Sequence, residues 1–366
     1  MICPQCKNQD PKYFHTFNNI TYCRKCIKYG QTGKIAPVTN KKSNLSVDYK
    51  LNYQLTPLQQ ELSDNLLNRY QHHLNTTLKA VCGAGKTEIT YAVIKYALNL
   101  GHNVCFTTPR KELVIAKRLE TQFLNISITV VYGGHTEKID GQFIICTTHQ
   151  LYRYPNYFDL LILDELDAFP YLNNEVLENI LKNSIKGNYI YMSATLSDKP
   201  DLLMSKRYHS YPLDIPKCYL TSSFMMYLLS YKLVSTYIQE KKPVLIFVPT
   251  IRLTTIAYRY FKILGIKSKA VSSKTKNVHQ LINQLKTNKL DALITTTILE
   301  RGITVENVQV IILYGNNSIY SCSTLIQICG RVGRNKNYPT GTISIFTPYK
   351  TKAIKQCIKT IKKDNA

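Results

Sequence analysis

Residues 80–88 (A-V-C-G-A-G-K-T-E) constrain the fold of this chain more than any other stretch. They end in Gly85-Lys86-Thr87, the last three positions of the phosphate-binding pattern G-x-x-x-x-G-K-[ST], although Ala80 replaces its first glycine. Gly83 and Gly85 allow successive backbone N–H groups to point at one anion. A strand is predicted before this loop and a helix over residues 89–100 after it, so bound phosphates would lie at a helix N-terminus.

The residue types of the loop assign a role to each position. Gly83, Ala84 and Gly85 would cradle phosphates, Lys86 would reach the β- and γ-phosphates of ATP, and the Thr87 hydroxyl would bind Mg²⁺. The alternative is a glycine-rich turn without a ligand, which the motifs downstream disfavour.

Length and charge limit the class of protein. A chain of 366 residues is expected to form two or three domains. No apolar run is long enough to cross a bilayer and the N-terminus lacks a signal-peptide core, so we expect a cytosolic protein with no transmembrane segment. The formal charge of +24, from 47 basic and 23 acidic residues, indicates a nucleic-acid partner. Codon usage rich in A and T could account for part of the lysine excess.

Two C-x-x-C pairs near the N-terminus, separated by 16 residues, predict a structural zinc site: Cys3, Cys6, Cys23 and Cys26. Four thiolates complete a tetrahedron, and the metal stabilises a segment too small to fold on its own core. A redox-active pair and unmetallated surface thiols are the alternatives. His15 could replace one cysteine, and the basic residues around the second pair could contact DNA or face solvent.

Residues 27–52 have little periodicity and are interpreted as a linker. The helix predicted next has Thr56 as N-cap and Pro57 at its first position. The amide of Gln59 carries both a donor and an acceptor, as contact with an adenine edge requires.

Strands and helices then alternate, which predicts a parallel sheet with its ligands at the strand C-termini. The expected strands span residues 77–81, 104–107, 126–132, 143–146, 160–163 and 189–192. Asp164 and Glu165 follow the fifth strand, where Asp164 would hold Mg²⁺ and Glu165 would act as general base toward water. An acidic pair after a strand can also serve as a helix cap.

A proline-containing stretch, residues 196–221, is interpreted as a crossing between domains. A second alternation follows, with strands at residues 244–248, 292–294, 310–313 and 343–346 and a helix over 321–328. Arg331 and Arg334 come directly after that helix and suit the role of arginine fingers toward a γ-phosphate. The lysine-rich C-terminal helix is expected to pack on the second domain.

These blocks, in this order over residues 54–347, resemble a superfamily 2 helicase or translocase. By this resemblance, Gln59 matches the Q motif and Gly302 belongs to the nucleotide-contacting motif V. The resemblance also implies coupling residues (Ser193, Thr195, Gln327) and DNA contacts (Pro109, Arg110, Thr147, Thr148, Thr250, Thr296).

Three features make the chain resemble one family in particular, the ComFA family of late competence helicases. They are the four-cysteine module ahead of the helicase motifs, the continuation of the acidic motif as D-E-L-D-A-F-P, and the I-L-E-R-G form of motif V. That resemblance implies an ATP-driven DNA translocase at the cytoplasmic face of the DNA-uptake machinery, with a peripheral position at the membrane as one option. Competence proteins such as ComFC and the membrane DNA channel are its implied partners. Thr304, where many DEAD-box relatives have aspartate, leaves the choice between RNA and DNA open.

The sequence therefore predicts an α/β protein with two tandem RecA-like domains behind a zinc-binding module. The predicted boundaries are 1–50 for the module and linker, 51–205 for the ATP-binding domain and 206–366 for the second domain. The expected activity is a DNA-dependent ATPase acting on single-stranded DNA, with ATP, Mg²⁺ and Zn²⁺ as cofactors. The alternatives are a replication-restart or recombination helicase of the PriA or RecG kind, and a non-hydrolysing DNA-binding scaffold.

Overall fold

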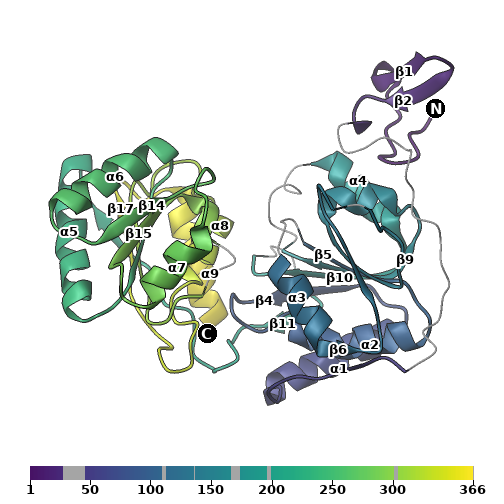
Figure 1. The fold of residues 1–366 in the computed structure, drawn as a ribbon, viewed down its shortest axis with the longest axis horizontal. Helices are drawn as coiled ribbons and strands as arrows, with labels where there is room; N and C mark the ends of the chain where they lie inside the picture. Colours follow the sequence, from purple (N-terminus) through teal and green to yellow (C-terminus); the bar gives the residue numbers. More distant parts are fainter. Residues whose placement is uncertain are drawn as a thin grey trace. The chain divides into compact units, whose positions relative to one another are not determined.

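The computed structural model describes residues 1–27, 46–108, 113–135, 137–165, 174–195, 199–300 and 304–365. Over these residues the chain divides into two compact units (Figure 1). The first comprises Met1–Ala80 and Gly85–Met204, and the second comprises Val81–Ala84 and Ser205–Ala366.

The first unit is built on a parallel sheet, as the alternation of strands and helices predicted. Its described strands lie in the order β11-β4-β10-β9-β5-β8-β7, and every neighbouring pair is parallel. In that order they span Leu202–Met204, Thr76–Ala80, Ile185–Ser193, Phe158–Asp164, Val104–Thr108, Phe143–Thr147 and Ile128–Val131.

Strand β9 shows why the central strands are continuous apolar runs. Leu161 and Leu163 belong to one buried cluster with helix α4 (Glu175–Ser184), whereas Leu160 and Ile162 alternate to the other face, and all four are fully buried. Helices α1 (Pro57–Gln71) and α2 (Tyr91–Asn99) lie on the opposite side of the sheet from α4 (Figure 1). Helix α3 (Leu113–Gln122) and the 3₁₀ segments η3 (Glu88–Thr90) and η4 (Thr148–Arg153) complete this unit's connections.

The N-terminal residues form a small hairpin, β1 (Phe14–Phe17) with β2 (Ile20–Cys23), after the 3₁₀ turn η1 (Pro11–Tyr13). The linker interpretation is wrong at its C-terminal end. Strand β3 (Asp48–Tyr49) pairs antiparallel with β6 (Phe123–Leu124). The preceding Val47 is fully buried, and its N–H donates to Asn99 Oδ1 at 2.8 Å. A two-residue strand has too little periodicity to be recognised in the sequence.

The second unit contains a second parallel sheet, in the order β12-β17-β16-β13-β15-β14 over its described strands. These span Lys217–Leu220, Ile343–Thr347, Gln309–Ile312, Val244–Phe247, Ala292–Thr295 and Ser268–Val271. Its helical segments are α5 (Ser223–Gln239), α6 (Ile251–Ile263), α7 (Val278–Lys286), η5 (Thr297–Glu300), α8 (Cys322–Cys329) and α9 (Lys352–Asn365).

Helices α5 and α6 share one buried cluster with the sheet, to which Met226, Val234 and Phe261 contribute. The C-terminal helix α9 buries Ile354, Cys357 and Ile361 and contacts α8, which confirms that it packs on the second domain. Among the helices within the described ranges, none combines the length and the apolar character needed to cross a membrane.

The proline-containing crossing holds more structure than its sequence indicated. Strand β11 extends the first sheet beside β4, and β12 extends the second beside β17. The division between the units falls between Met204 and Ser205, directly after β11.

Asp201 holds β11 against β4. Its Oδ2 accepts the Thr77 N–H at 2.8 Å and the Thr77 hydroxyl at 2.7 Å, and Arg69 Nη2 lies 2.8 Å from Oδ1. Burial acts to raise the pKa of this carboxyl, but the Thr77 hydrogen bonds and the Arg69 charge outweigh it and lower the pKa below its usual value. Stability from this group is therefore present above about pH 4, the unfolded value, and is lost as the pH falls through the folded value.

We expect Asp201→Asn to lower the free energy of unfolding by about 1–2 kcal/mol at neutral pH, because an amide replaces a charge-assisted acceptor at a half-exposed site. Thermal unfolding measured from pH 7 to pH 3 should show the difference from the parent chain shrinking on acidification. Asp64→Asn is the matched control, because Asp64 accepts from the neutral Gln60 amide. An equal loss at pH 3 and pH 7 would contradict the assignment.

Candidate nucleotide site and metal centre

The loop between β4 and η3 has the backbone that the glycines predicted. Gly83 and Gly85 have φ of +83° and +80°, values that side-chain-bearing residues rarely adopt. Thr87 is buried and stands directly before η3, which continues into α2. The expected order of strand, loop and helix N-terminus is therefore present.

Lys86 lies beside the acidic motif, as a phosphate-binding site requires. Its Nζ is 4.0 Å from Asp164 Oδ1, and each side chain is only 13% exposed. Burying a cation and a carboxylate costs free energy unless they face each other or a ligand of matching charge. Strand order explains the meeting, because β10 separates β4 from β9 and all three strands end at the same edge.

Glu165 follows Asp164 with φ of +65°, and its N–H donates to Met192 O at 2.9 Å. A left-handed glutamate is strained backbone, which recurs at functional sites. Ser193, at the end of the neighbouring β10, is fully buried, and its Oγ accepts the Thr195 N–H at 3.0 Å. The sheet thus places Ser193, one of the predicted coupling residues, next to the predicted acids.

Gln59 lies against the loop from the side of α1. Its Oε1 accepts the Thr56 N–H at 3.0 Å in a capping box, which confirms Thr56 as N-cap. A Cβ at Gly85 would meet Gln59 Nε2 at 2.4 Å, so the amide and the glycine are in direct contact. One end of the amide is therefore used by the helix cap and the other faces the phosphate loop.

The ion pair between Glu88 and Arg118 was missed by the sequence interpretation. Arg118 Nη1 lies 2.7 Å from Glu88 Oε1, and the glutamate side chain is 7% exposed. Glu88 directly follows the phosphate loop, but Arg118 comes thirty positions later on α3, so no local spacing signals the contact.

In the second unit, Gln327 and Arg331 are both 4% exposed, on α8 and just beyond it. Arg334 Nε donates to Gly330 O at 2.9 Å, which closes the turn that follows the helix. The spacing of the motif thus gathers the three predicted side chains around one helix end.

The predicted DNA contacts differ in accessibility. Thr147 ends strand β8 and Thr148 begins η4, and they are 8% and 1% exposed. Thr296 is half-buried, whereas Thr250 is exposed and caps α6 by accepting the Leu253 N–H at 3.2 Å. Pro109, Arg110 and Gly302 lie outside the described residues, as does the rest of the acidic motif after Glu165.

The four N-terminal cysteines form one buried cluster in which all four sulfur atoms lie within 4.8 Å of one another. The Sγ atoms of Cys3 and Cys26 are 3.6 Å apart, and those of Cys6 and Cys23 are 3.8 Å apart. A tetrahedral zinc with Zn–S bonds of about 2.3 Å requires sulfur separations of about 3.8 Å. The cluster therefore fits zinc. His15 is exposed on β1 and packs edge-on against Tyr22.

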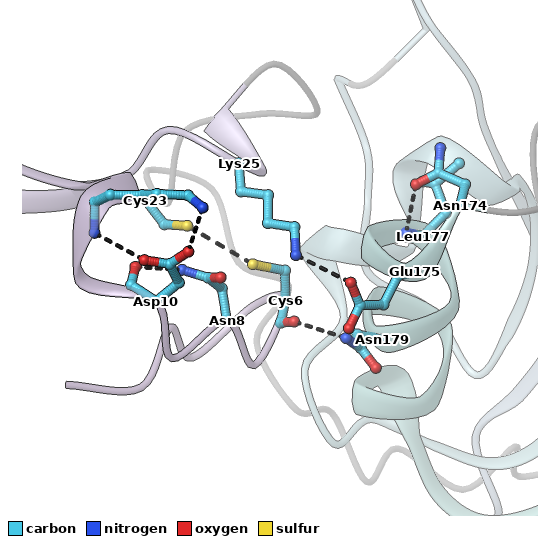
Figure 2. A network of polar contacts seen from close by, with 10 residues as sticks. Cys6, Asn8, Asp10, Cys23, Lys25, Asn174, Glu175, Leu177 and Asn179 are labelled. Carbon is cyan, nitrogen blue, oxygen red and sulfur yellow. Dashed lines mark hydrogen bonds and ion pairs between the residues drawn. The ribbon is translucent and has the colours of Figure 1, made fainter.

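The cysteine module docks on helix α4. The Asn179 side-chain amide donates to Cys6 O and that of Asn183 donates to Pro4 O, each at 3.0 Å. Figure 2 shows Lys25 reaching Glu175 on the same helix, at 3.0 Å. The sulfurs share one apolar cluster with α4 residues such as Leu177 and Ile180.

We expect the double replacement Asn179→Ala and Asn183→Ala to loosen the module from α4. Each amide contributes about 0.5–1.5 kcal/mol to stability. Hydrogen exchange should speed up at the backbone amides of residues 3–8 and of α4, while the rest of the sheet keeps its protection. Asn68→Ala, at an exposed position of α1, is the control. Unchanged exchange at residues 3–8 would show that these amides do not hold the module.

Two family models match the chain. Residues 52–198 match the type III restriction enzyme res subunit, and residues 227–336 match the helicase conserved C-terminal domain. Two curated relatives are both named competence protein ComFA. That of Bacillus subtilis is 33% identical over 99% of this chain and 85% of the relative. That of Streptococcus pneumoniae is 34% identical over 100% of this chain and 90% of the relative.

Solved structures support the fold. Saccharomyces cerevisiae Dbp5 bound to RNA and ADP BeF3 aligns with a TM-score of 0.59 and 16% identity, over 85% of this chain and 92% of that one. RecG bound to a three-way DNA junction aligns with a TM-score of 0.57 and 18% identity, over 86% of this chain and 47% of that one. At these identities the likeness concerns the fold, which is that of two RecA-like helicase domains.

Sequence identity above 30% over nearly the full length of both competence proteins goes further than fold. Together with the two helicase domains and the four-cysteine cluster, it shows that this chain belongs to the ComFA family of helicases.

Proposed function

We propose that this chain is an ATP-driven translocase that acts on single-stranded DNA during DNA uptake in competence. The observation that carries the proposal is the approach of Lys86 Nζ to Asp164 Oδ1, 4.0 Å apart and nearly buried, in a chain of the ComFA family. A lysine facing an aspartate at the C-terminal edge of a parallel sheet suits Mg²⁺-bound phosphates.

The site residues divide the work by their chemistry. Gly83, Ala84 and Gly85 would offer backbone N–H groups, Lys86 would neutralise phosphate charge, and Thr87 and Asp164 would hold Mg²⁺. Glu165 orients and deprotonates the attacking water. Bound Mg²⁺ would offset the charge that develops on the phosphate oxygens.

The second domain would supply Arg331 and Arg334 as cations toward the transferred phosphoryl group. Ser193, Thr195 and Gln327 would couple nucleotide state to domain movement. DNA contacts are proposed for the residues around the predicted motifs, namely Pro109, Arg110, Thr147, Thr148, Thr250 and Thr296. The charge of +24 supports a polyanionic track.

The partners of the proposed motor would be competence proteins such as ComFC and the membrane DNA channel, reached from the cytosol. A replication-restart or recombination helicase of the PriA or RecG kind is the alternative enzyme, and it would act on branched duplexes. A non-hydrolysing scaffold is the alternative outside enzymes. The ATPase measurements below separate all three.

We expect ATP hydrolysis to rise strongly with single-stranded DNA, and Lys86→Ala to reduce it at least about a hundredfold because the phosphate charge loses its partner. The assay compares single-stranded DNA, branched duplex and RNA at one stated salt concentration, with circular dichroism to verify the fold. Lys79→Ala is the control, on the strand that precedes the loop. Stimulation by branched duplex alone would favour the alternative helicase, and turnover insensitive to Lys86→Ala would refute the site.

We further propose that the four cysteines bind one structural zinc ion. The purified chain should contain about one zinc per molecule, and Cys6→Ser with Cys23→Ser should remove it and lower the thermal unfolding midpoint. Cys218→Ser, outside the cluster, should retain both zinc and stability. A metal content that is the same in both variants would contradict this assignment.

A further inference from the structure

A short segment of the second unit, residues 207–209, contacts the backbone of the turn that carries the two proposed arginine fingers. We refer to residues 331–334 as the arginine turn. Arg207 Nη1 donates to Val332 O at 2.7 Å and also to Gly333 O. One guanidinium therefore fixes two successive carbonyl groups of the turn.

The next two residues extend the contact along the same turn. The Tyr208 hydroxyl donates to Arg334 O at 3.1 Å. His209 Nε2 lies 2.9 Å from Gly333 O, while its Nδ1 accepts the Tyr211 N–H at 3.2 Å. Since Nδ1 accepts, the proton is on Nε2, and the neutral imidazole donates to the turn. Burial lowers the pKa of His209, which favours this neutral form.

Gly333 shows how close this packing is. Its φ is +66°, and a Cβ there would lie 2.3 Å from Pro339 O and 2.8 Å from Arg207 Nη1. A glycine is therefore needed for the left-handed backbone and for the close approach of the Pro339 carbonyl, and Arg207 also leaves little room for a side chain. This close packing explains why the second glycine of the motif G-R-V-G-R, Gly333, carries no side chain.

Burying the charged side chain of Arg207 costs a desolvation free energy that apolar packing alone would not offset. Arg207 is 2% exposed, and burial lowers its pKa to about 10, so it is still charged at neutral pH. Arg334 lies near enough to oppose that charge, and Asp214 near enough to favour it. Arg207 Nε also donates to Cys82 O at 3.2 Å. Movement of the arginine turn would therefore remove two of the three carbonyl acceptors of this buried cation, which disfavours such movement.

We propose that Arg207, Tyr208 and His209 are positioning residues for hydrolysis: they hold the arginine turn in the conformation that presents Arg331 and Arg334. The inference rests on the proposed function, since it matters only if those arginines assist the reaction. Catalytic groups displaced by about 1 Å lose up to a hundredfold in rate, so the backbone under the turn has a direct effect on turnover.

The test measures DNA-stimulated ATPase in the full-length chain with Arg207→Met, Tyr208→Phe, His209→Phe and His209→Gln. We expect kcat to fall about tenfold or more for Arg207→Met and His209→Phe, with KM for ATP changed less than about threefold. His209→Gln should recover most of the loss, because its amide N–H can still donate to Gly333 O. Tyr208→Phe, at a partly exposed site, should lower kcat by a smaller factor.

His279→Gln and Tyr349→Phe are matched controls at exposed positions of the same unit. Thermal unfolding is measured on every variant. A lower unfolding midpoint with kcat unchanged, or His209→Gln no better than His209→Phe, would show that residues 207–209 only stabilise the fold and would overturn the inference.

Arg331→Ala and Arg334→Ala are measured alongside. If neither lowers kcat, the proposed role of the arginines fails. If they lower kcat while the variants at residues 207–209 do not, only the positioning role fails.

Discussion

The approach of Lys86 to Asp164 is the contact on which the proposed nucleotide site depends. It brings together a loop and a strand end that are separated by nearly eighty residues, and it does so because β10 fills the place between β4 and β9. The register of the strands determines which residues are neighbours at this edge. Met192 lies opposite Asp164, and Ser193 lies opposite Lys79 just ahead of the loop. The sheet edge therefore arranges the loop, the acids and Ser193 as one group, without long loops to hold them.

Much of this arrangement was predictable because its signals are local. The buried strands are continuous apolar runs, the glycines accompany positive φ, and Thr56 with Pro57 marks a helix start. The C-x-x-C pairs predicted a four-sulfur cluster from spacing alone, and the structure brings those sulfurs together. Each of these features needs only a few neighbouring residues to specify it.

The features that escaped prediction include helix α5 and several contacts between distant segments. Helix α5 follows a proline-rich stretch, and its tyrosines and leucines surround it almost evenly, so it lacks a clear apolar stripe. Three of these contacts join residues far apart in the chain. They are the pairing of β3 with β6, the ion pair of Glu88 with Arg118, and the hydrogen bonds from residues 207–209 to the arginine turn. Composition and periodicity carry no information about such pairs.

The docking of the cysteine module on α4 has a consequence for how the protein is made. The contacts of Pro4, Cys6 and Lys25 are with residues 150 to 179 positions later in the chain. A ribosome adds roughly 5–20 residues per second, so the module waits on the order of ten seconds or more for its platform. During that wait only contacts within the module itself are available to the four thiols. Vectorial synthesis thus delivers the segment that carries the four cysteines before the α4 surface on which it docks has been made.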